Sequence, residues 1–441
     1  MPLKIGMVSL GCPKNQVDAE ILLSLIKKEG WEITTEAGLS DVVVVNTCGF
    51  IESAKQESID TILEFCELKK EGRISKIVIT GCLAERYRDE IKKEIPEVDV
   101  ILGIGSNENI VDVIKKSLGG EELSLYGEKC DLPLSGDRVL STLPFYAYLK
   151  VAEGCDNRCS YCAIPLIRGG FRSRPQDDII KEATLLAENG VEELVLVAQD
   201  TTRYGEDLYG KYMLADLLKQ LVKIEKLRWI RILYCYPDRI TDELIKVIAE
   251  EPKICKYLDI PIQHVAENVV SRMNRTGNRK TITELLTKIR KNIPDIVLRT
   301  TLIAGFPGET EDDFTELCEF IDEMKFERLG CFPYSAEDDT PAATMPNQID
   351  EDTKNHRAEH IMEQQMFIMD NFNKTLIGKQ LEVVVEGFDQ HGQIYFGRSK
   401  LDAPDIDGKV FFTSKTKRYI GDFINVKIEE IMDYDLLAKE V

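Results

Sequence analysis

Short apolar runs and longer amphipathic stretches take turns over residues 1–120. The runs KIGMVSLGC, DVVVVNTC and KIVITGC are rich in β-branched residues and end in turn-forming residues, which is typical of buried strands. The stretches between them, such as DAEILLSLIKKEG, carry apolar residues at helical spacing. Repeated strand–helix–strand units predict an α/β domain with a parallel sheet and right-handed crossovers.

Residues 121–142 interrupt this pattern, and a second alternating series fills residues 143–372. The interruption is rich in Gly, Ser, Pro and Asp and predicts a linker. The second series ends in a long polar helix, and its predicted strands are FYAYLKVAE, ELVLVAQD, WIRILYC, YLDIPIQ, IVLRTTLIAG and RLGCFPYS. About six strand–helix units indicate a full or partial TIM-like barrel, whose site lies at the carboxyl ends of the strands.

Residues 373–441 change character again. LEVVVEGFD, GQIYFGRS, KVFFT and FINVKIEEIM are short alternating runs separated by Gly and Asp turns. This pattern predicts a small all-β barrel or sandwich. The fold class is therefore α/β with a separate β-domain at the end of the chain.

Charge narrows the choice of partner. The 441 residues include 56 Lys and Arg against 77 Asp and Glu, for a net charge of −21. Such a chain repels phosphate backbones unless it hides a basic patch, and it attracts basic proteins. No apolar run reaches the ~20 residues of a membrane helix, and the sequence opens without a secretory leader. We expect a soluble, cytoplasmic protein with no membrane partner.

Twelve cysteines are many for such a protein. A disulfide scaffold is short and secreted, so metal binding or redox chemistry is the better interpretation. Cys130 lies in a loop-like stretch and has no clear role. Five others sit in apolar patterns and are interpreted as small core residues: Cys66, Cys235, Cys255, Cys318 and Cys331.

Cys155, Cys159 and Cys162 fall within eight residues, in VAEGCDNRCSYCAIPLIRGG, after the first predicted barrel strand. Thiolates are soft ligands for iron or zinc. A structural zinc site takes four ligands, and no fourth Cys or His is near. Three ligands on a four-iron cluster leave one iron open for a cofactor. The alternative is a zinc site completed from elsewhere, which would bind zinc without iron.

Cys12, Cys48 and Cys82 are far apart in sequence but occupy equivalent positions. Each stands where an apolar run ends, in SLGC, VNTC and ITGC. Because the carboxyl ends of parallel strands share one edge of the sheet, the three thiols are expected to converge there. They could hold a second cluster with an open iron. The alternative is three buried structural cysteines.

The C-x3-C-x2-C spacing after a first strand resembles the radical S-adenosylmethionine (SAM) superfamily. The resemblance implies that the open iron binds SAM and that an electron from the cluster splits SAM into a deoxyadenosyl radical. It also implies SAM contacts from an aromatic residue in the loop, from the end of the second strand and from LIAGFPGET, where a plain strand-to-helix turn is the alternative. These predicted SAM-binding residues are Tyr161, Gln199, Gly305, Gly308 and Glu309.

Three other polar residues have structural interpretations. Arg168 and Arg172 follow the cysteine loop and could pair a carboxylate, but a solvated surface role is an equal alternative. His264 is interpreted as a structural histidine rather than a catalytic one.

The two triads and the terminal β-domain together resemble the methylthiotransferase family, which has a second 4Fe–4S cluster and a TRAM domain. Within it the chain is similar to the branch that modifies ribosomal protein twelve of the small subunit. The segments that carry this resemblance are SLGCPKNQVDAE, NTCGFIESAKQESI, GCLAERY, EGCDNRCSYCAIPLIRGGFRSRP and DIPIQH.

The resemblance implies methylthiolation of an aspartate β-carbon with two SAM molecules and two 4Fe–4S clusters. It also implies an electron donor such as flavodoxin or ferredoxin, and a sulfur donor. Two alternatives stay open: a transfer-RNA adenosine methylthiotransferase, and a non-catalytic metal-binding assembly protein. Charge favours a protein substrate, since acidic residues outnumber basic ones twelve to nine from Ile377 to Val441. Three clustered cations argue against a protein substrate, because they could contact RNA: Lys415, Lys417 and Arg418.

Overall fold

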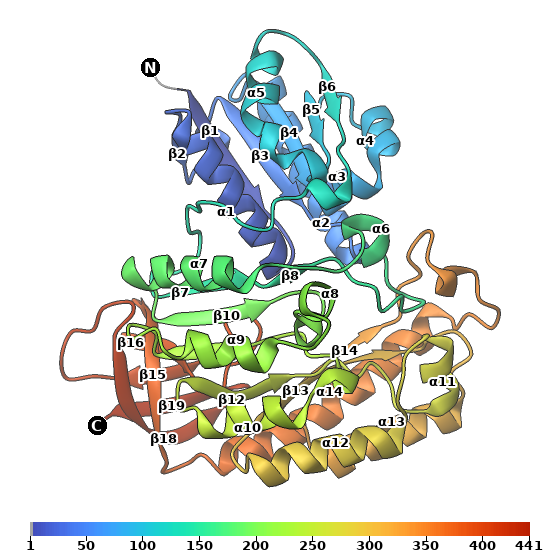
Figure 1. Ribbon diagram of the computed structural model, residues 1–441, viewed down its shortest axis with the longest axis vertical. Helices are drawn as coiled ribbons and strands as arrows, with labels where there is room; N and C mark the ends of the chain where they lie inside the picture. The colour runs from blue at the N-terminus through green and yellow to red at the C-terminus, as the bar shows by residue number, and fades with distance from the viewer. Residues whose placement is uncertain (1–2) are drawn as a thin grey trace. The chain divides into compact units, whose positions relative to one another are not determined.

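The computed structural model describes residues 3–441, which form two compact units (Figure 1). The first unit combines the chain up to Ser141 with two later segments, Ala152–Arg174 and Ser335–Ala343. The second combines Thr142–Val151, Pro175–Tyr334 and Thr344–Val441. The loop with Cys155, Cys159 and Cys162 therefore shares a unit with Cys12, Cys48 and Cys82.

A six-stranded parallel sheet forms the centre of the first unit (Figure 1). Its strand order is β2-β1-β3-β4-β5-β6, which confirms the predicted parallel α/β fold. The order reverses between β1 and β3, the position at which ligands bind in open parallel sheets. The strands are β1 (Lys4–Ser9), β2 (Glu32–Thr34), β3 (Val42–Thr47), β4 (Lys76–Gly81), β5 (Val100–Leu102) and β6 (Leu123–Leu125).

Both faces of this sheet are buried. Val42 and Val44 of β3 pack with α1 (Pro13–Lys28) and α5 (Ile110–Leu118) in one apolar cluster. Val43 and Val45 pack with α2 in a second cluster. Alternate residues of β3 thus pack into two separate apolar clusters, one on each face of the sheet. For this reason β3 is a continuous apolar run. The remaining helices of this part are α2 (Glu52–Lys70), α3 (Cys82–Arg86), α4 (Arg88–Glu94) and the short turns η1 (Ala37–Leu39) and η2 (Ile104–Asn109).

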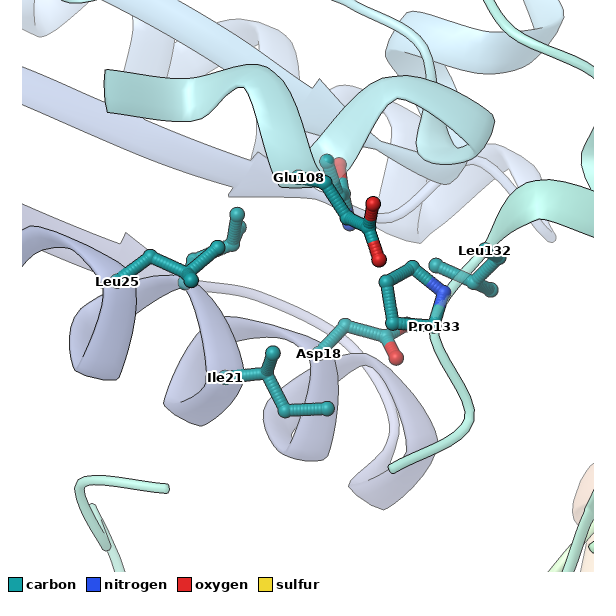
Figure 2. A pocket seen from close by; sticks show the side chains of 8 residues that line it. Asp18, Ile21, Leu25, Glu108, Leu132 and Pro133 are labelled. Carbon is teal, nitrogen blue, oxygen red and sulfur yellow. The ribbon is translucent and has the colours of Figure 1, made fainter. Parts of the chain in front are cut away.

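The stretch predicted as a linker, residues 121–142, is packed rather than free. It contains β6, which pairs with β5, and the turn η3 (Lys129–Asp131). Figure 2 shows Leu132 and Pro133 beside Asp18 and Ile21 of α1, around a cavity the size of a water molecule. Further along, Arg138 Nε donates to the buried carboxylate of Glu20 at 2.9 Å.

The first later segment of this unit is a short hairpin of β8 (Ala152–Glu153) and β9 (Arg172–Ser173), with α6 (Ile164–Arg168) between them. The second later segment contains the start of η6 (Pro341–Thr344). The Ala342 N–H donates to Ser160 O at 2.9 Å, which joins this segment to the cysteine loop.

The second unit contains a six-stranded parallel sheet in simple sequential order, β14-β13-β12-β11-β10-β7. Over the described residues the sheet is open, so the TIM-like fold is partial rather than full. Its strands are β7 (Tyr146–Lys150), β10 (Glu193–Val197), β11 (Trp229–Ile232), β12 (Ile254–Asp259), β13 (Val297–Ala304) and β14 (Arg328–Pro333). Its helices are α7 (Gln176–Glu188), α8 (Glu206–Tyr209), α9 (Leu214–Leu221), α10 (Asp242–Glu250), α11 (Glu267–Arg272), α12 (Arg279–Asn292), α13 (Glu311–Met324) and α14 (Glu351–Lys374), with η4 (Thr201–Arg203) and η5 (Pro237–Arg239).

The last strands of the chain form a closed five-stranded barrel in the same unit. Of the two predicted folds for this segment, the structure therefore shows the barrel and not the sandwich. The strand order is β15-β16-β17-β19-β18. The strands are β15 (Gln380–Asp389), β16 (Ile394–Ser399), β17 (Val410–Thr413), β18 (Phe423–Met432) and β19 (Asp435–Glu440).

Acidic residues after β16 attach this small barrel to the open sheet. Asp405 Oδ2 accepts hydrogen bonds from Tyr148 at 3.2 Å and Tyr146 at 3.3 Å, both on β7. Asp407 Oδ2 accepts from Tyr257 of β12 at 2.6 Å. Part of the acidic excess of residues 377–441 is therefore used inside the molecule.

Candidate functional site

Cys12, Cys48 and Cys82 follow three neighbouring strands of the first sheet. Cys48 comes directly after β3, Cys82 directly after β4, and Cys12 caps the amino end of α1 after β1. Since β1, β3 and β4 are adjacent and parallel, their carboxyl ends lie along one edge. The structure brings these three predicted ligands together.

Glycines allow the three cysteine loops to approach one another. Gly11 has φ +87°, and a Cβ there would lie 2.7 Å from the Cys48 Sγ. A Cβ on Gly49 would lie 2.8 Å from the Leu83 Cα, in the turn that carries Cys82. Any side chain at these two positions would push the loops apart. Glycine at Gly11 and Gly49 therefore allows the cysteine loops to lie close together.

Polar side chains hold the loop backbones in place. The Asn15 amide donates to Leu10 O at 2.8 Å and to Thr47 O at 3.2 Å, joining the ends of β1 and β3. Ser58 of α2 donates to Cys48 O at 2.9 Å and accepts from the Cys48 N–H at 3.0 Å. Both clamps are buried. Sequence reasoning missed them, because the residues they join are far apart along the chain.

The three thiols differ electrostatically. Burial raises the pKa of Cys48 to about 12, and burial also raises the pKa of Cys82. For Cys12, burial opposes ionisation, but the Lys14 and Arg168 cations and the N–H groups at the start of α1 lower its pKa overall. A helix amino end favours a thiolate in this way. Three converging soft donors beside cations fit an anionic iron–sulfur cluster.

Cys155, Cys159 and Cys162 lie in the loop after β8. The Cys155 N–H donates to Gly169 O at 3.1 Å and the Cys162 N–H donates to Cys159 O at 3.0 Å, so the loop folds back on itself. Cys155 and Cys159 are buried and Cys162 is partly exposed. Over residues 3–441 no three His, Cys, Asp or Glu side chains are arranged around a single metal ion. The thiolates of a four-iron cluster each bind a different iron, so this arrangement is not required of them.

Arg168, at the end of α6, joins the two triads within the first unit. Its side chain is 1% exposed. Nη1 lies 2.8 Å from Asp18 Oδ2 and 3.0 Å from Glu153 Oε2, and Nη2 lies 3.6 Å from Cys82 Sγ. Cys82 also packs against Ala163 and Ile167 in an apolar cluster. For Arg168 the predicted pairing with a carboxylate is correct, and the alternative of a solvated surface role is wrong. Arg172 instead donates to the backbone oxygens of Cys130 and Lys129.

Gly305, Gly308 and Glu309 have protein neighbours in the second unit. A Cβ on Gly305 would lie 2.4 Å from Lys354 Cγ, and one on Gly308 would overlap Arg272. Glu309 Oε2 accepts from the Gly305 N–H at 2.9 Å, and Oε1 pairs with a buried arginine of α14. A strand-to-helix turn accounts for all three residues. Their contact with SAM stays a prediction.

Gln199 and Tyr161 stay predicted SAM contacts as well. Gln199 stands between β10 and η4, next to Asp200, whose carboxylate accepts from the Arg203 N–H at 3.2 Å. Tyr161 directly precedes Cys162 in the cysteine loop. His264 is buried, and its Nδ1 accepts from the Ala266 N–H at 3.1 Å, in agreement with a structural role.

Two of the three clustered cations on the terminal barrel contact neighbouring side chains. Arg418 forms an ion pair with Glu440. Lys417 lies over the Tyr419 ring, 5.1 Å from its centroid.

Over residues 3–441, no helix is long and apolar enough to span a membrane.

Three family models match the chain in succession. Residues 4–103 match "Uncharacterized protein family UPF0004", residues 149–321 match the radical SAM superfamily, and residues 377–441 match the TRAM domain. The second and third matches confirm the predicted radical SAM and TRAM domains.

Curated relatives cover the whole length. The chain is 50% identical over 444 residues to the ribosomal protein uS12 methylthiotransferase RimO of Desulforamulus reducens, covering 99% of each chain. It is 51% identical to the protein of the same name from Clostridium botulinum, covering 99% of this chain and 97% of that one. Among solved structures, a radical SAM methyltransferase, TsrM from Kitasatospora setae, has a similar fold at 13% identity, with a TM-score of 0.58 over 78% of this chain and 77% of that one.

Proposed function

The chain belongs to the family of ribosomal protein uS12 methylthiotransferases, and from this membership we propose that it transfers a methylthio group to the β-carbon of an aspartate in uS12, using SAM and two 4Fe–4S clusters. It is a radical SAM enzyme. The observation that carries the proposal is the convergence of Cys12, Cys48 and Cys82 at one sheet edge, in the same compact unit as the radical SAM cysteine loop.

The two triads are assigned separate duties. Cys155, Cys159 and Cys162 hold the radical SAM cluster, and Cys12, Cys48 and Cys82 hold the second. The bound clusters supply the electron that cleaves SAM and an open iron for sulfur. Radical chemistry suits this substrate, because the β-hydrogen of an aspartate is too weakly acidic for an ordinary base.

The protein's own residues prepare the second site before any cluster binds. Asn15 and Ser58 fix the backbone on either side of the thiols. Arg168 and Lys14 bring positive charge to thiols that ionise when they bind iron. Burial of Cys48 and Cys82 keeps water from that edge.

Several finer assignments complete the proposal. The SAM contacts are Tyr161, Gln199, Gly305, Gly308 and Glu309. Flavodoxin or ferredoxin donates electrons, and a separate donor supplies sulfur. A ribosomal protein substrate implies action in the cytoplasm. The domains are residues 1–120 for the second cluster, 121–142 as a connecting segment, 143–372 for the radical SAM fold and 373–441 for the TRAM barrel.

The transfer-RNA alternative is less well supported by charge. The terminal barrel carries an acidic excess, and Arg418 is neutralised by Glu440. An RNA-binding surface needs cations that are available to phosphates. These observations favour a basic protein substrate over RNA.

The test is reconstitution of the protein with iron and sulfide without oxygen, followed by reductant, SAM and a peptide carrying the aspartate loop of uS12. We expect mass spectrometry to find one added methylthio group, with deoxyadenosine formed. An unchanged peptide alongside deoxyadenosine would contradict the substrate assignment, and transfer RNA would then be tested. Absence of deoxyadenosine, or binding of zinc without iron, would favour a non-catalytic metal protein.

A triple variant separates the two clusters. Replacing Cys12, Cys48 and Cys82 together with Ala is expected to halve the iron content and abolish methylthiolation, while SAM cleavage survives. Loss of both activities together would argue against separate duties for the triads.

A further inference from the structure

A groove in the first unit has no role in the proposed chemistry, although one of its lining residues, Leu83, directly follows Cys82. The groove lies against α2, α3 and α4 and has a volume of about 490 Å³. Pockets of ~300–1,000 Å³ are the usual size for specific binding. Its apolar lining consists of Ile59, Leu63, Leu83, Tyr87, Ile91 and Ile95. We call it the α2–α4 groove.

The floor of the groove is the outer side of the core, because Leu83, Ile91 and Ile95 are buried in the main cluster and Ile59 and Tyr87 pack against it. Among the described apolar lining residues, Leu63 is the one that lies outside this cluster. Ile59 and Leu63 are four residues apart on α2 and therefore lie on one face of that helix. Ile62 and Phe65, on another face, are buried in the main cluster beneath the sheet. Leu63 is 46% exposed, although it lines an apolar groove. Exposed apolar surface that is gathered in a concave site marks an interaction surface.

The rim of the groove is acidic. Glu52, Glu90, Glu94 and Asp338 line it, and the only lining cation among the described residues is Lys55. The Lys55 ammonium is already engaged, 2.6 Å from Glu52 and 3.4 Å from the buried Glu337. Glu94 pairs with Lys93, but both side chains are largely exposed, and such pairs contribute little. The groove therefore presents net negative charge around an apolar floor.

We infer that the α2–α4 groove docks a cationic segment of the ribosomal protein substrate, with an apolar side chain of that segment against Leu63 and Ile59 of α2. This inference rests on the proposed function and deepens it. Proteins that bind ribosomal RNA are basic, because they neutralise phosphates. An acidic rim attracts such a segment and increases the rate of encounter, while the apolar floor holds it. The same rim repels RNA.

The test compares two variants with matched controls. Glu90→Lys combined with Glu94→Lys reverses charge on the rim, and Leu63→Ser removes exposed apolar surface. The controls are Glu121→Lys with Glu122→Lys and Leu118→Ser, which alter exposed residues of the same unit outside the groove. Circular dichroism and iron content verify that each variant folds and binds its clusters.

Two readouts keep this inference separate from the proposed function. Fluorescence anisotropy of labelled full-length uS12 measures binding without turnover, and methylthiolation rates give kcat and KM. We expect each groove variant to weaken binding and raise KM by about tenfold, with kcat and deoxyadenosine formation unchanged. A short aspartate-loop peptide, which lacks the docking segment, should give the same KM with every variant.

Salt provides an independent check. Binding of uS12 to the unaltered protein should weaken as ionic strength rises, and the charge-reversed variant should lose most of that dependence. Unchanged affinity and KM in both groove variants would overturn the inference even if uS12 is modified normally. If uS12 is bound through the groove but never modified, the docking surface stands and the proposed function fails.

Discussion

Arg168 offers the most direct test of how the first unit is built. Its guanidinium is 1% exposed and faces two carboxylates that are equally buried, those of Asp18 at 2% and Glu153 at 0%. Replacing Arg168 with Met keeps much of the side-chain volume but removes the cation. Both carboxylates then lose this cation in a buried site. Breaking a buried ion pair in this way costs about 3–5 kcal/mol, and we expect Arg168→Met to fall in that range because it removes one cation from two buried carboxylates.

The chain's two tryptophans allow the effect to be assigned to one unit. Trp31 belongs to the first unit and Trp229 to the second. In a Trp229→Phe background, the fluorescence of Trp31 follows the first unit during urea unfolding of the cluster-free protein. The free energy of unfolding is then obtained by linear extrapolation, with and without Arg168→Met.

A rescue variant tests the physical cause. Adding Asp18→Asn and Glu153→Gln to Arg168→Met removes the two buried negative charges that the arginine balanced, so the triple variant should be more stable than the single one. The reasoning is refuted if Arg168→Met lowers the free energy of unfolding by less than about 1 kcal/mol, below the ~3–5 kcal/mol range for a broken buried pair. It is also refuted if the triple variant is no more stable than the single variant.

Other changes test the cysteine loops, the sheet and the terminal barrel. Gly11→Ala, at φ +87° and beside the Cys48 thiol, should lower iron content toward half while SAM cleavage persists; unchanged iron would contradict the packing argument. The pKa of Asp99 lies below its ordinary value of 3.8, because its lysine partners outweigh burial. Its contribution to stability is therefore complete above pH ~4 and is lost as pH falls through the folded-state pKa, so Asp99→Asn should destabilise the protein at pH 7 and progressively less under acid. Tyr257→Phe removes one of the two hydrogen bonds to Asp407 Oδ2, the other coming from the Ala403 N–H, and should cost about 1–3 kcal/mol in the second unit, measured through Trp229 fluorescence with Phe substituted at Trp31.

Periodicity predicted the large features because they depend on local patterns. The apolar runs of β3 and β4 are buried on both faces, so consecutive apolar residues in the sequence indicate that burial. Equivalent positions after parallel strands then required the three cysteines to converge. The interpretation of residues 121–142 depended on a short strand whose partner is distant in the sequence. β6 is three residues long and pairs only with β5, so its segment was interpreted as a linker.

The roles of the polar residues at the site could not be predicted either, because their partners are distant in the sequence. Arg168 and Asp18 are 150 positions apart, and neither stands in a pattern that signals burial. Asn15 and Ser58 bind backbone atoms of distant loops, which composition does not reveal. The glycines beside Cys12 and Cys48 were visible in the sequence, but only the close approach of the loops explains why no side chain fits there.

The same contacts explain why both triads belong to one unit although about seventy residues separate Cys82 from Cys155. Arg168 comes from the loop of one triad and reaches the carboxylate of Asp18, the amide of Asn15 and the thiol of Cys82, all at the edge of the other. Each of these partners is buried, so the arginine provides a donor to polar groups inside the protein. The contact is made by protein atoms alone. These contacts therefore hold the cysteine loop of one triad against the sheet edge that carries the other.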